Sequence, residues 1–305
     1  MIKPTFVALL IALVAAPAEA QVAKGPWGGK MKGVGKYAKV NGLELYYSTQ
    51  GQGKAQPLIL LHGGAGASEM YLPIIPVLAR GRQLISVDLQ GHGRTADIDR
   101  PLDPVLMADD IAALVKQLGL ASVDVMGYSL GGAVALQVAI RHPELVRRLV
   151  VVSAVHKRGA IYPEVLAMAS KGMPPEALEM MKSTPMYQLY ASLAPRPEDF
   201  MKLMGKLSDV MKNDFDISKQ VSEIKAPTLV VAADADMFPP SAAAEMFGLL
   251  GGGKKDAGWD GKGRPASQLA ILPGLTHYNI FASPLLAQAA VPFLDAELPA
   301  PKSPQ

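Results

Sequence analysis

Short, nearly continuous apolar runs alternate along most of this chain with longer segments of helical pattern. Six runs are predicted as strands buried on both faces: 58–61, 84–87, 123–126, 149–155, 228–233 and 268–272. Helices are predicted over 68–80, over 104–118 with Asp103 as N-cap, and over 132–141, 241–250 and 284–294. Strands that alternate with helices form a parallel, doubly wound sheet, because each crossover helix returns the chain to begin the next strand in the same direction. The predicted fold class is therefore α/β.

Two segments depart from this alternation. Near the amino terminus, the strand-like runs 34–40 and 43–49 flank Asn41-Gly42, a strong signal for a two-residue hairpin turn, so the sheet should begin with an antiparallel pair. Further along, residues 156–223 lack a convincing strand and contain helix-like pieces separated by prolines, which indicates a helical insert. The sheet domain would then comprise 21–155 and 224–297, followed by a short tail over 298–305.

The predicted insert is rich in methionine, a flexible and polarizable side chain that adapts to varied apolar surfaces. We expect most of these residues to pack the insert against the sheet domain, and the others to offer an adaptable surface to a ligand. They are Met168, Met173, Met180, Met181, Met186, Met201, Met204 and Met211.

The first twenty residues have the features of a secretory signal peptide. Lys3 is followed by an apolar run over 6–16 and by Ala18-Glu19-Ala20, which fits an Ala-x-Ala cleavage site. The apolar run is too short to span a bilayer, so no stable membrane span is expected. We predict a mature chain that begins near Gln21 and is periplasmic or secreted.

Composition limits the classes of function. The chain has 305 residues, no cysteine and 50% hydrophobic content, so we expect one large domain without disulfides or thiolate metal sites. Its formal net charge is +3, and no basic block or aromatic-basic stripe stands out, so no nucleic-acid partner is predicted. The sequence predicts no particular oligomeric state.

The glycine- and charge-rich segment 251–265, which contains Trp259, joins a predicted helix to a predicted strand. It should lie on the surface, at the sheet edge opposite the ligand-binding edge.

The pentapeptide Gly127-Tyr128-Ser129-Leu130-Gly131 places a serine where a predicted strand turns into a predicted helix. Glycines on both sides allow the sharp turn that exposes a nucleophilic serine. The helix that follows directs free N–H groups and the positive end of its dipole toward the same point, which suits an oxyanion. Ser129 is therefore the predicted nucleophile.

An activated serine needs a histidine base, which a carboxylate usually orients. Of the five histidines, His62 precedes two glycines in a possible oxyanion loop, His92 lies in a tight turn, His142 ends a helix as a surface cap, and His156 opens the insert in a Lys-Arg context. His277 follows the last strand and is the predicted base.

Two aspartates follow the strand 228–233 and are candidates for the carboxylate. We favour Asp236 over Asp234, because Asp234 is close enough to the strand end to serve as a turn or capping residue.

Taken together, these motifs resemble the α/β-hydrolase fold superfamily over residues 36–296, and the order Ser129, Asp236, His277 is the order used by that family. The resemblance implies that 156–223 is a helical cap, and that the oxyanion hole uses the N–H of Leu130 and that of Gly64 or its neighbour. One position departs from the family pattern. Ala233 stands where a glycine is common three residues before the acid, which keeps Asp234 open as an alternative.

The resulting hypothesis is a cofactor- and metal-independent serine hydrolase, specifically a carboxylesterase that acts on small or medium esters through an acyl-enzyme. Acyltransferase, lactonase, peptidase, carbon–carbon hydrolase and perhydrolase activities would use the same triad and stay open. Epoxide hydrolases and haloalkane dehalogenases resemble the fold but need an aspartate nucleophile, which Ser129 argues against. A non-catalytic ligand-binding protein is the alternative from a different class.

Overall fold

The protein is described by a computed structural model that covers residues 34–171 and 174–297; the predicted signal peptide and tail lie outside these residues. Eight strands form one sheet in the order β1-β2-β4-β3-β5-β6-β7-β8. Their bounds are β1 Val34–Val40, β2 Leu43–Gln50, β3 Ala55–Leu61, β4 Arg82–Val87, β5 Val123–Tyr128, β6 Val146–Val152, β7 Thr228–Ala235 and β8 Gln268–Thr276. The β1–β2 and β2–β4 pairs are antiparallel, and the other five pairs are parallel, which confirms the predicted sheet.

The predicted hairpin is confirmed as β1 and β2, which pair from Val40↔Leu43 to Val34↔Thr49. Both turn residues have positive φ, 46° at Asn41 and 85° at Gly42. A two-residue turn of this type matches the natural twist of the strands it joins, and asparagine and glycine tolerate its backbone angles best.

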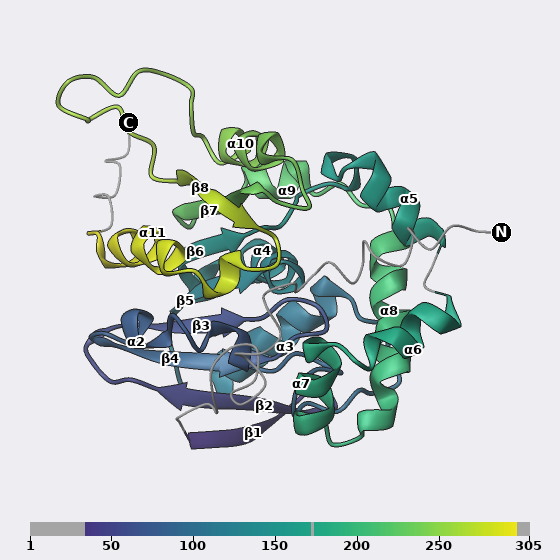
Figure 1. Ribbon diagram of the computed structural model, residues 1–305. Coiled ribbons are helices and arrows are strands. Elements are labelled where there is room, and N and C mark those ends of the chain that lie inside the picture. Colours follow the sequence, from purple (N-terminus) through teal and green to yellow (C-terminus); the bar gives the residue numbers. More distant parts are fainter. Residues whose placement is uncertain (1–33, 172–173, 298–305) are drawn as a thin grey trace.

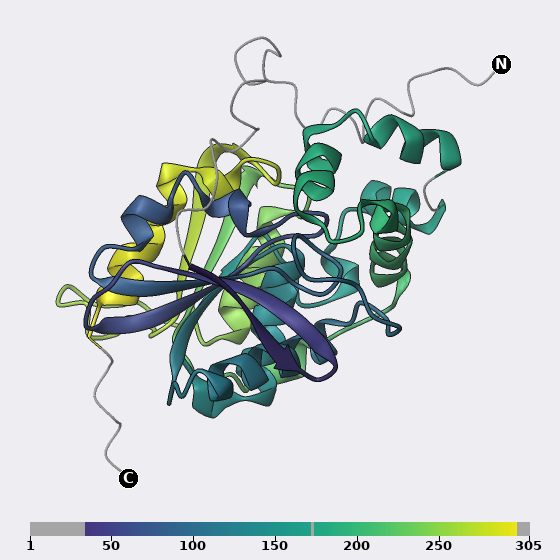
Figure 2. The ribbon, with the colours of Figure 1, turned by 90° about the horizontal axis from the view of Figure 1, so that it is seen from below.

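Helices cover both faces of the sheet (Figures 1 and 2). One face packs against α3 (Pro104–Gln117), α4 (Leu130–Arg141) and α10 (Pro240–Leu249), and the other against α2 (Ile75–Leu78) and α11 (Pro284–Asp295). Strand β3 shows why the buried runs are almost wholly apolar. Ile59 and Leu61 enter the first core, Leu58 and Leu60 enter the second, and all four are fully buried.

The helix predicted over 68–80 is wrong. The chain instead forms a 3₁₀ helix over Ser68–Tyr71 and the single turn α2. Pro73 has no N–H to bond the carbonyl of Glu69, and the N–H of Leu72 bonds that carbonyl instead, at 3.1 Å. Strand β6 begins and ends three residues before its predicted bounds. It ends at Val152 because Ser153 adopts a positive φ of 48°.

Between β6 and β7 the described chain is helical. It forms α5 (Pro163–Lys171), α6 (Pro175–Met181), α7 (Pro185–Leu193), α8 (Phe200–Lys212) and α9 (Ser218–Ser222). Figure 1 shows α5 to α8 as a group beside one edge of the sheet, the position of a helical cap. No helix within 34–171 or 174–297 has the length and apolar content needed to cross a bilayer.

Most methionines of this insert with a described side chain pack inward. Met181 is buried, and Met211 packs against a small cluster around Phe238, whereas Met180 is exposed. Met173 lies outside the described residues. Three further methionines pack on the main core: Met186, Met201 and Met204.

A charged cluster lies at the amino ends of the central strands. Asp124 of β5 is fully buried between Arg82 of β4 and Arg147 of β6; the Nε atom of Arg147 donates to Oδ1 of Asp124 at 2.9 Å. Arg147 also donates to the carbonyl of Leu294 at 2.8 Å and so ties the last helix to the sheet. Burial raises the pKa of Asp124 to about 6, and the guanidinium of Arg147 opposes this rise.

Asp124→Asn should lower the free energy of unfolding by about 3 kcal/mol, because it leaves the guanidinium of Arg147 without its counter-ion. It also removes one of the two carboxylates that pair with the buried guanidinium of Arg82, which keeps Asp295. Urea unfolding followed by circular dichroism measures this loss. Asp109→Asn is the matched control, since Asp109 pairs with Arg141 near the surface, and it should cost less than about 1 kcal/mol. Equal losses in the two variants would contradict the assigned role of the buried cluster.

Candidate active site

Ser129 lies in a tight turn between β5 and α4. Its backbone has φ 53° and ψ −118°, a combination that a residue with a side chain adopts only under strain. A Cβ atom on Gly127 would lie 2.0 Å from the carbonyl oxygen of Gly131, and one on Gly131 would lie 2.2 Å from that of Leu61. The turn therefore requires glycine at both positions. The N–H of Ser129 donates to the carbonyl of Val152 at 2.9 Å, which secures the turn against β6.

The structure brings the three predicted catalytic side chains together. The Nε2 atom of His277 lies 3.1 Å from Oγ of Ser129, and its Nδ1 atom lies 2.7 Å from Oδ1 of Asp236. With a proton on Nδ1 donated to the carboxylate, Nε2 is left free to accept the hydroxyl proton of the serine. His277 and Asp236 are both buried.

The two candidate aspartates have different surroundings. The carboxylate of Asp236 also accepts hydrogen bonds from the hydroxyl of Ser153 and from the N–H of Ala233. Burial acts to raise the pKa of Asp236, but the hydrogen bond and charge of His277, with these other donors, hold the pKa below its ordinary value. The group is thus a carboxylate at neutral pH.

Asp234 is exposed, and it accepts from the N–H groups of Gly274 and Leu275 at 3.0 and 3.2 Å. It caps the bend in β8 that leads to the histidine and does not itself contact His277. Of the two candidate aspartates, Asp236 is therefore the one that the structure brings into contact with His277.

Aromatic side chains hold the imidazole of His277 in place. The ring of Tyr128 lies 5.1 Å from it, that of Phe238 lies 5.3 Å away edge-on, and that of Tyr278 lies 5.4 Å away edge-on. The hydroxyl of Tyr128 donates to the carbonyl of His277 at 2.7 Å. Sequence reasoning missed these residues, and also Ser153, although each is next to or within two residues of a predicted strand end or site residue.

The two residues predicted for the oxyanion hole lie on either side of the serine turn. Leu130 is the first residue of α4, and Gly64 follows Gly63, on which a Cβ would lie 3.3 Å from Cβ of Ser129. Among the described residues, neither the N–H of Leu130 nor that of Gly64 donates to a protein acceptor. A Cβ on Gly64 would lie 3.2 Å from Leu207 of α8, so the insert packs directly over this loop.

The other four histidines have contacts elsewhere. His62 accepts at Nε2 from the N–H of Leu89 at 3.0 Å and contacts the carbonyl of Gly63 through Nδ1 at 2.8 Å, so it supports the glycine loop. Burial lowers the pKa values of both His62 and His92, that of His92 to about 3, and their rings lie 5.1 Å apart. His142 pairs with Asp109 at the end of α4, and His156 is buried at the start of the insert, 3.5 Å from Glu245.

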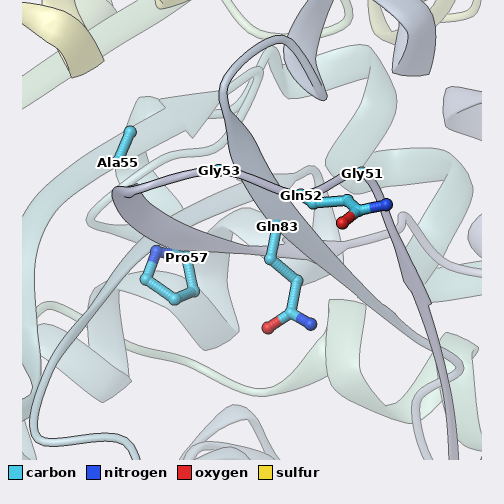
Figure 3. A pocket seen from close by; sticks show the side chains of 6 residues that line it. All are labelled: Gly51, Gln52, Gly53, Ala55, Pro57 and Gln83. Atoms are coloured by element: carbon cyan, nitrogen blue, oxygen red, sulfur yellow. The ribbon is translucent and has the colours of Figure 1, made fainter.

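Figure 3 shows the residues that line a surface cavity of about 400 Å³. They lie near the amino ends of β3 and β4, whereas Ser129 follows the carboxyl end of β5. The cavity is lined by Gly51, Gln52, Gly53, Ala55, Pro57 and Gln83. None of these side chains ionises, so the cavity has no acid, base or nucleophile. The described residues contain no group of three or more histidine, cysteine or carboxylate side chains that could hold a metal ion.

Comparison with known proteins agrees with this fold. The family model for the alpha/beta hydrolase fold matches residues 56–182, and the chain has the α/β-hydrolase fold. RutD of Rhizobium rhizogenes, which is named for a carbamate hydrolase activity, is 29% identical over 61% of this chain and 77% of its own length. A soluble epoxide hydrolase of Corynebacterium sp. strain C12 is 35% identical over 43% of this chain and 46% of its own length.

Among solved structures, carboxylesterase CesB (YbfK) from Bacillus subtilis superposes with a TM-score of 0.67 at 19% identity. The superposition covers 87% of this chain and 92% of that one, and it shows a shared fold. Together with the hydrolase relatives, the fold supports hydrolase activity in this chain.

Because Gly127 lies so close to the backbone of Gly131, adding one methyl group there should strongly reduce the stability of the fold. Gly127→Ala should lower the free energy of unfolding by about 3 kcal/mol or more, because its Cβ would meet backbone atoms that cannot move without displacing α4. Thermal unfolding measures the loss. Gly248→Ala is the control: it lies in α10 with open space around its Cβ position, and should be neutral or stabilising by up to about 1 kcal/mol. A Gly127→Ala protein as stable as this control would contradict the described turn.

Proposed function

We propose that this protein is an exported serine hydrolase that cleaves small or medium carboxylic esters through an acyl-enzyme intermediate. The observation that carries the proposal is the unbroken line of hydrogen bonds from Asp236 through His277 to Ser129. A serine in this arrangement is activated by a base that is itself oriented by a carboxylate. Export is proposed from the signal-peptide pattern of residues 1–20.

The proposed reaction has two halves. Oγ of Ser129 attacks the ester carbonyl while its proton moves to Nε2 of His277, and the N–H groups of Leu130 and Gly64 stabilise the oxyanion. The tetrahedral intermediate collapses as His277 returns the proton to the departing alcohol. Water then attacks the acyl-enzyme with His277 again as base, which releases the carboxylic acid and restores the serine. Every step uses protein groups and water, and none calls for a metal or an organic cofactor.

The negative charge of Asp236 stabilises the imidazolium that forms in both halves. Its lowered pKa suits this role, because the group stays ionised throughout the neutral range. Tyr128, Phe238 and Tyr278 restrain the imidazole ring, so little reorganisation is needed when the proton moves.

The relatives' names span carbamate and epoxide chemistry, so the bond that is cleaved must be argued from the site. A carbamate carbonyl would react with Ser129 by the same steps as an ester. An epoxide requires attack at carbon by a carboxylate, and position 129 is a serine. Acyl transfer to an alcohol, lactone or peptide cleavage, carbon–carbon bond hydrolysis and perhydrolysis use the same triad and would be distinguished by a substrate screen.

A serine-directed fluorophosphonate should label the protein at Ser129, and Ser129→Ala should remove the label and lower kcat/KM for a p-nitrophenyl ester by about 10³-fold or more. Mass spectrometry of the modified peptide gives the position. Ser192→Ala, at an exposed serine of α7 that bonds its own helix, is the control and should keep label and activity. Folded wild-type protein that takes up no label would exclude the serine hydrolase and favour a non-catalytic binding protein.

The geometry of the two aspartates predicts unequal effects. Asp236→Asn should lower kcat by about 10³- to 10⁴-fold, because an amide oxygen or nitrogen opposite Nδ1 no longer stabilises the imidazolium and the required tautomer. Asp234→Asn should leave kcat/KM close to that of the wild type, since it alters only the loop contacts with Gly274 and Leu275. Steady-state kinetics on the same ester compares them, and a reversed order of effects would reassign the acid.

A further inference from the structure

The loop between α10 and β8 displays a tryptophan with no packing partner among the described residues. Trp259 is fully exposed, and the loop projects away from the helices and the sheet at the upper left of Figure 1. A side chain of this size usually buries most of its apolar area. The full exposure of Trp259 therefore indicates that this surface binds a partner.

Backbone hydrogen bonds shape the tip of this loop. The N–H of Gly261 donates to the carbonyl of Gly258 at 3.1 Å, and the N–H of Gly263 donates to that of Ala257 at 2.9 Å. Gly258 and Gly261 adopt φ of 73° and 68°, so glycine is required on both sides of Trp259. The indole of Trp259 is thus carried by a turn that backbone hydrogen bonds close.

Cations surround this turn. Lys254, Lys255, Lys262 and Arg264 are all exposed, against the two carboxylates Asp256 and Asp260. Asp260 is already paired with Lys262 at 2.8 Å, which leaves Lys254, Lys255 and Arg264 facing water with Asp256 as the remaining acid. The loop therefore has a positive local charge around an apolar centre.

We infer that loop 251–265 docks the protein on an anionic lipid surface. Tryptophan favours the boundary between headgroups and acyl chains, and nearby lysines and arginines are attracted to anionic headgroups. Charge complementarity selects lipid of this kind as the occupant. The loop precedes β8 and lies at the start of that strand, whereas His277 follows its end, so docking through the loop leaves the triad at the end of the strand that is remote from the bilayer.

The test is co-flotation of the purified protein with vesicles made of equal parts phosphatidylcholine and phosphatidylglycerol, compared with vesicles of phosphatidylcholine alone. The wild type should float with the anionic vesicles only, and high salt should release it. Replacing Lys254→Ala together with Lys255→Ala should weaken partitioning by about tenfold or more. Trp259→Ala should weaken it as well, and Trp259→Phe should restore part of the loss, because the aromatic ring is retained.

Two controls make the result specific to the loop. Lys36→Ala with Lys39→Ala removes the same charge from exposed positions on β1, at the other edge of the sheet, and should leave flotation unchanged. In a Trp27→Phe background, Trp259 is the remaining tryptophan, and its emission should shift to the blue when anionic vesicles are added. The variants compared by flotation share one N-terminus and should keep wild-type ester hydrolysis, so differences between them report on the loop.

Absence of flotation with anionic vesicles at low salt would overturn the inference. Equal losses in the loop variant and the β1 control would also overturn it, since general charge attraction would then explain the binding.

Discussion

The close passage of backbone at the turn after β5 is the constraint on which the site depends. Without side chains at Gly127 and Gly131, helix α4 can begin almost against the carbonyl groups that end β3. Ser129 is thereby pushed above the carboxyl edge of the sheet, and the first N–H groups of α4 converge below it. The strain in the serine backbone persists because β3, β5, β6 and α4 together hold both sides of the turn.

Around this turn, buried polar groups act mainly on the backbone of neighbouring loops. His62 joins the glycine loop to the end of β4 through Leu89, and Tyr128 fixes the carbonyl of His277. Neutral His62 satisfies this geometry, because it needs one ring nitrogen as donor and the other as acceptor. Burial keeps it in that form by lowering its pKa.

Much of this arrangement was predictable from the sequence. Strands buried on both faces show up as short apolar runs, and the Asn41-Gly42 turn and the serine turn have local signatures that do not depend on distant partners. The order of motifs was enough to suggest which serine, acid and histidine meet. Two predictions were wrong or open because they depend on local contacts that the apolar pattern does not report. Pro73 interrupts the helix that the apolar pattern predicted over 68–80. The choice between Asp234 and Asp236 depends on which carboxylate points toward His277. Support from Ser153 and Phe238 arises only when β6, β7 and β8 lie side by side.

The separation of the triad along the chain has a consequence for how the molecule matures. His277 follows Ser129 by 148 residues and Asp236 by 41, and the entire helical insert lies between the nucleophile and its acid. Contacts of such long range close late, after most of the loop-closure entropy has been lost. A chain that has folded only its first six strands would hold the serine turn without His277. In the proposed mechanism, nucleophilic reactivity at Ser129 would therefore require a sheet that is complete through β8, because His277 follows that strand.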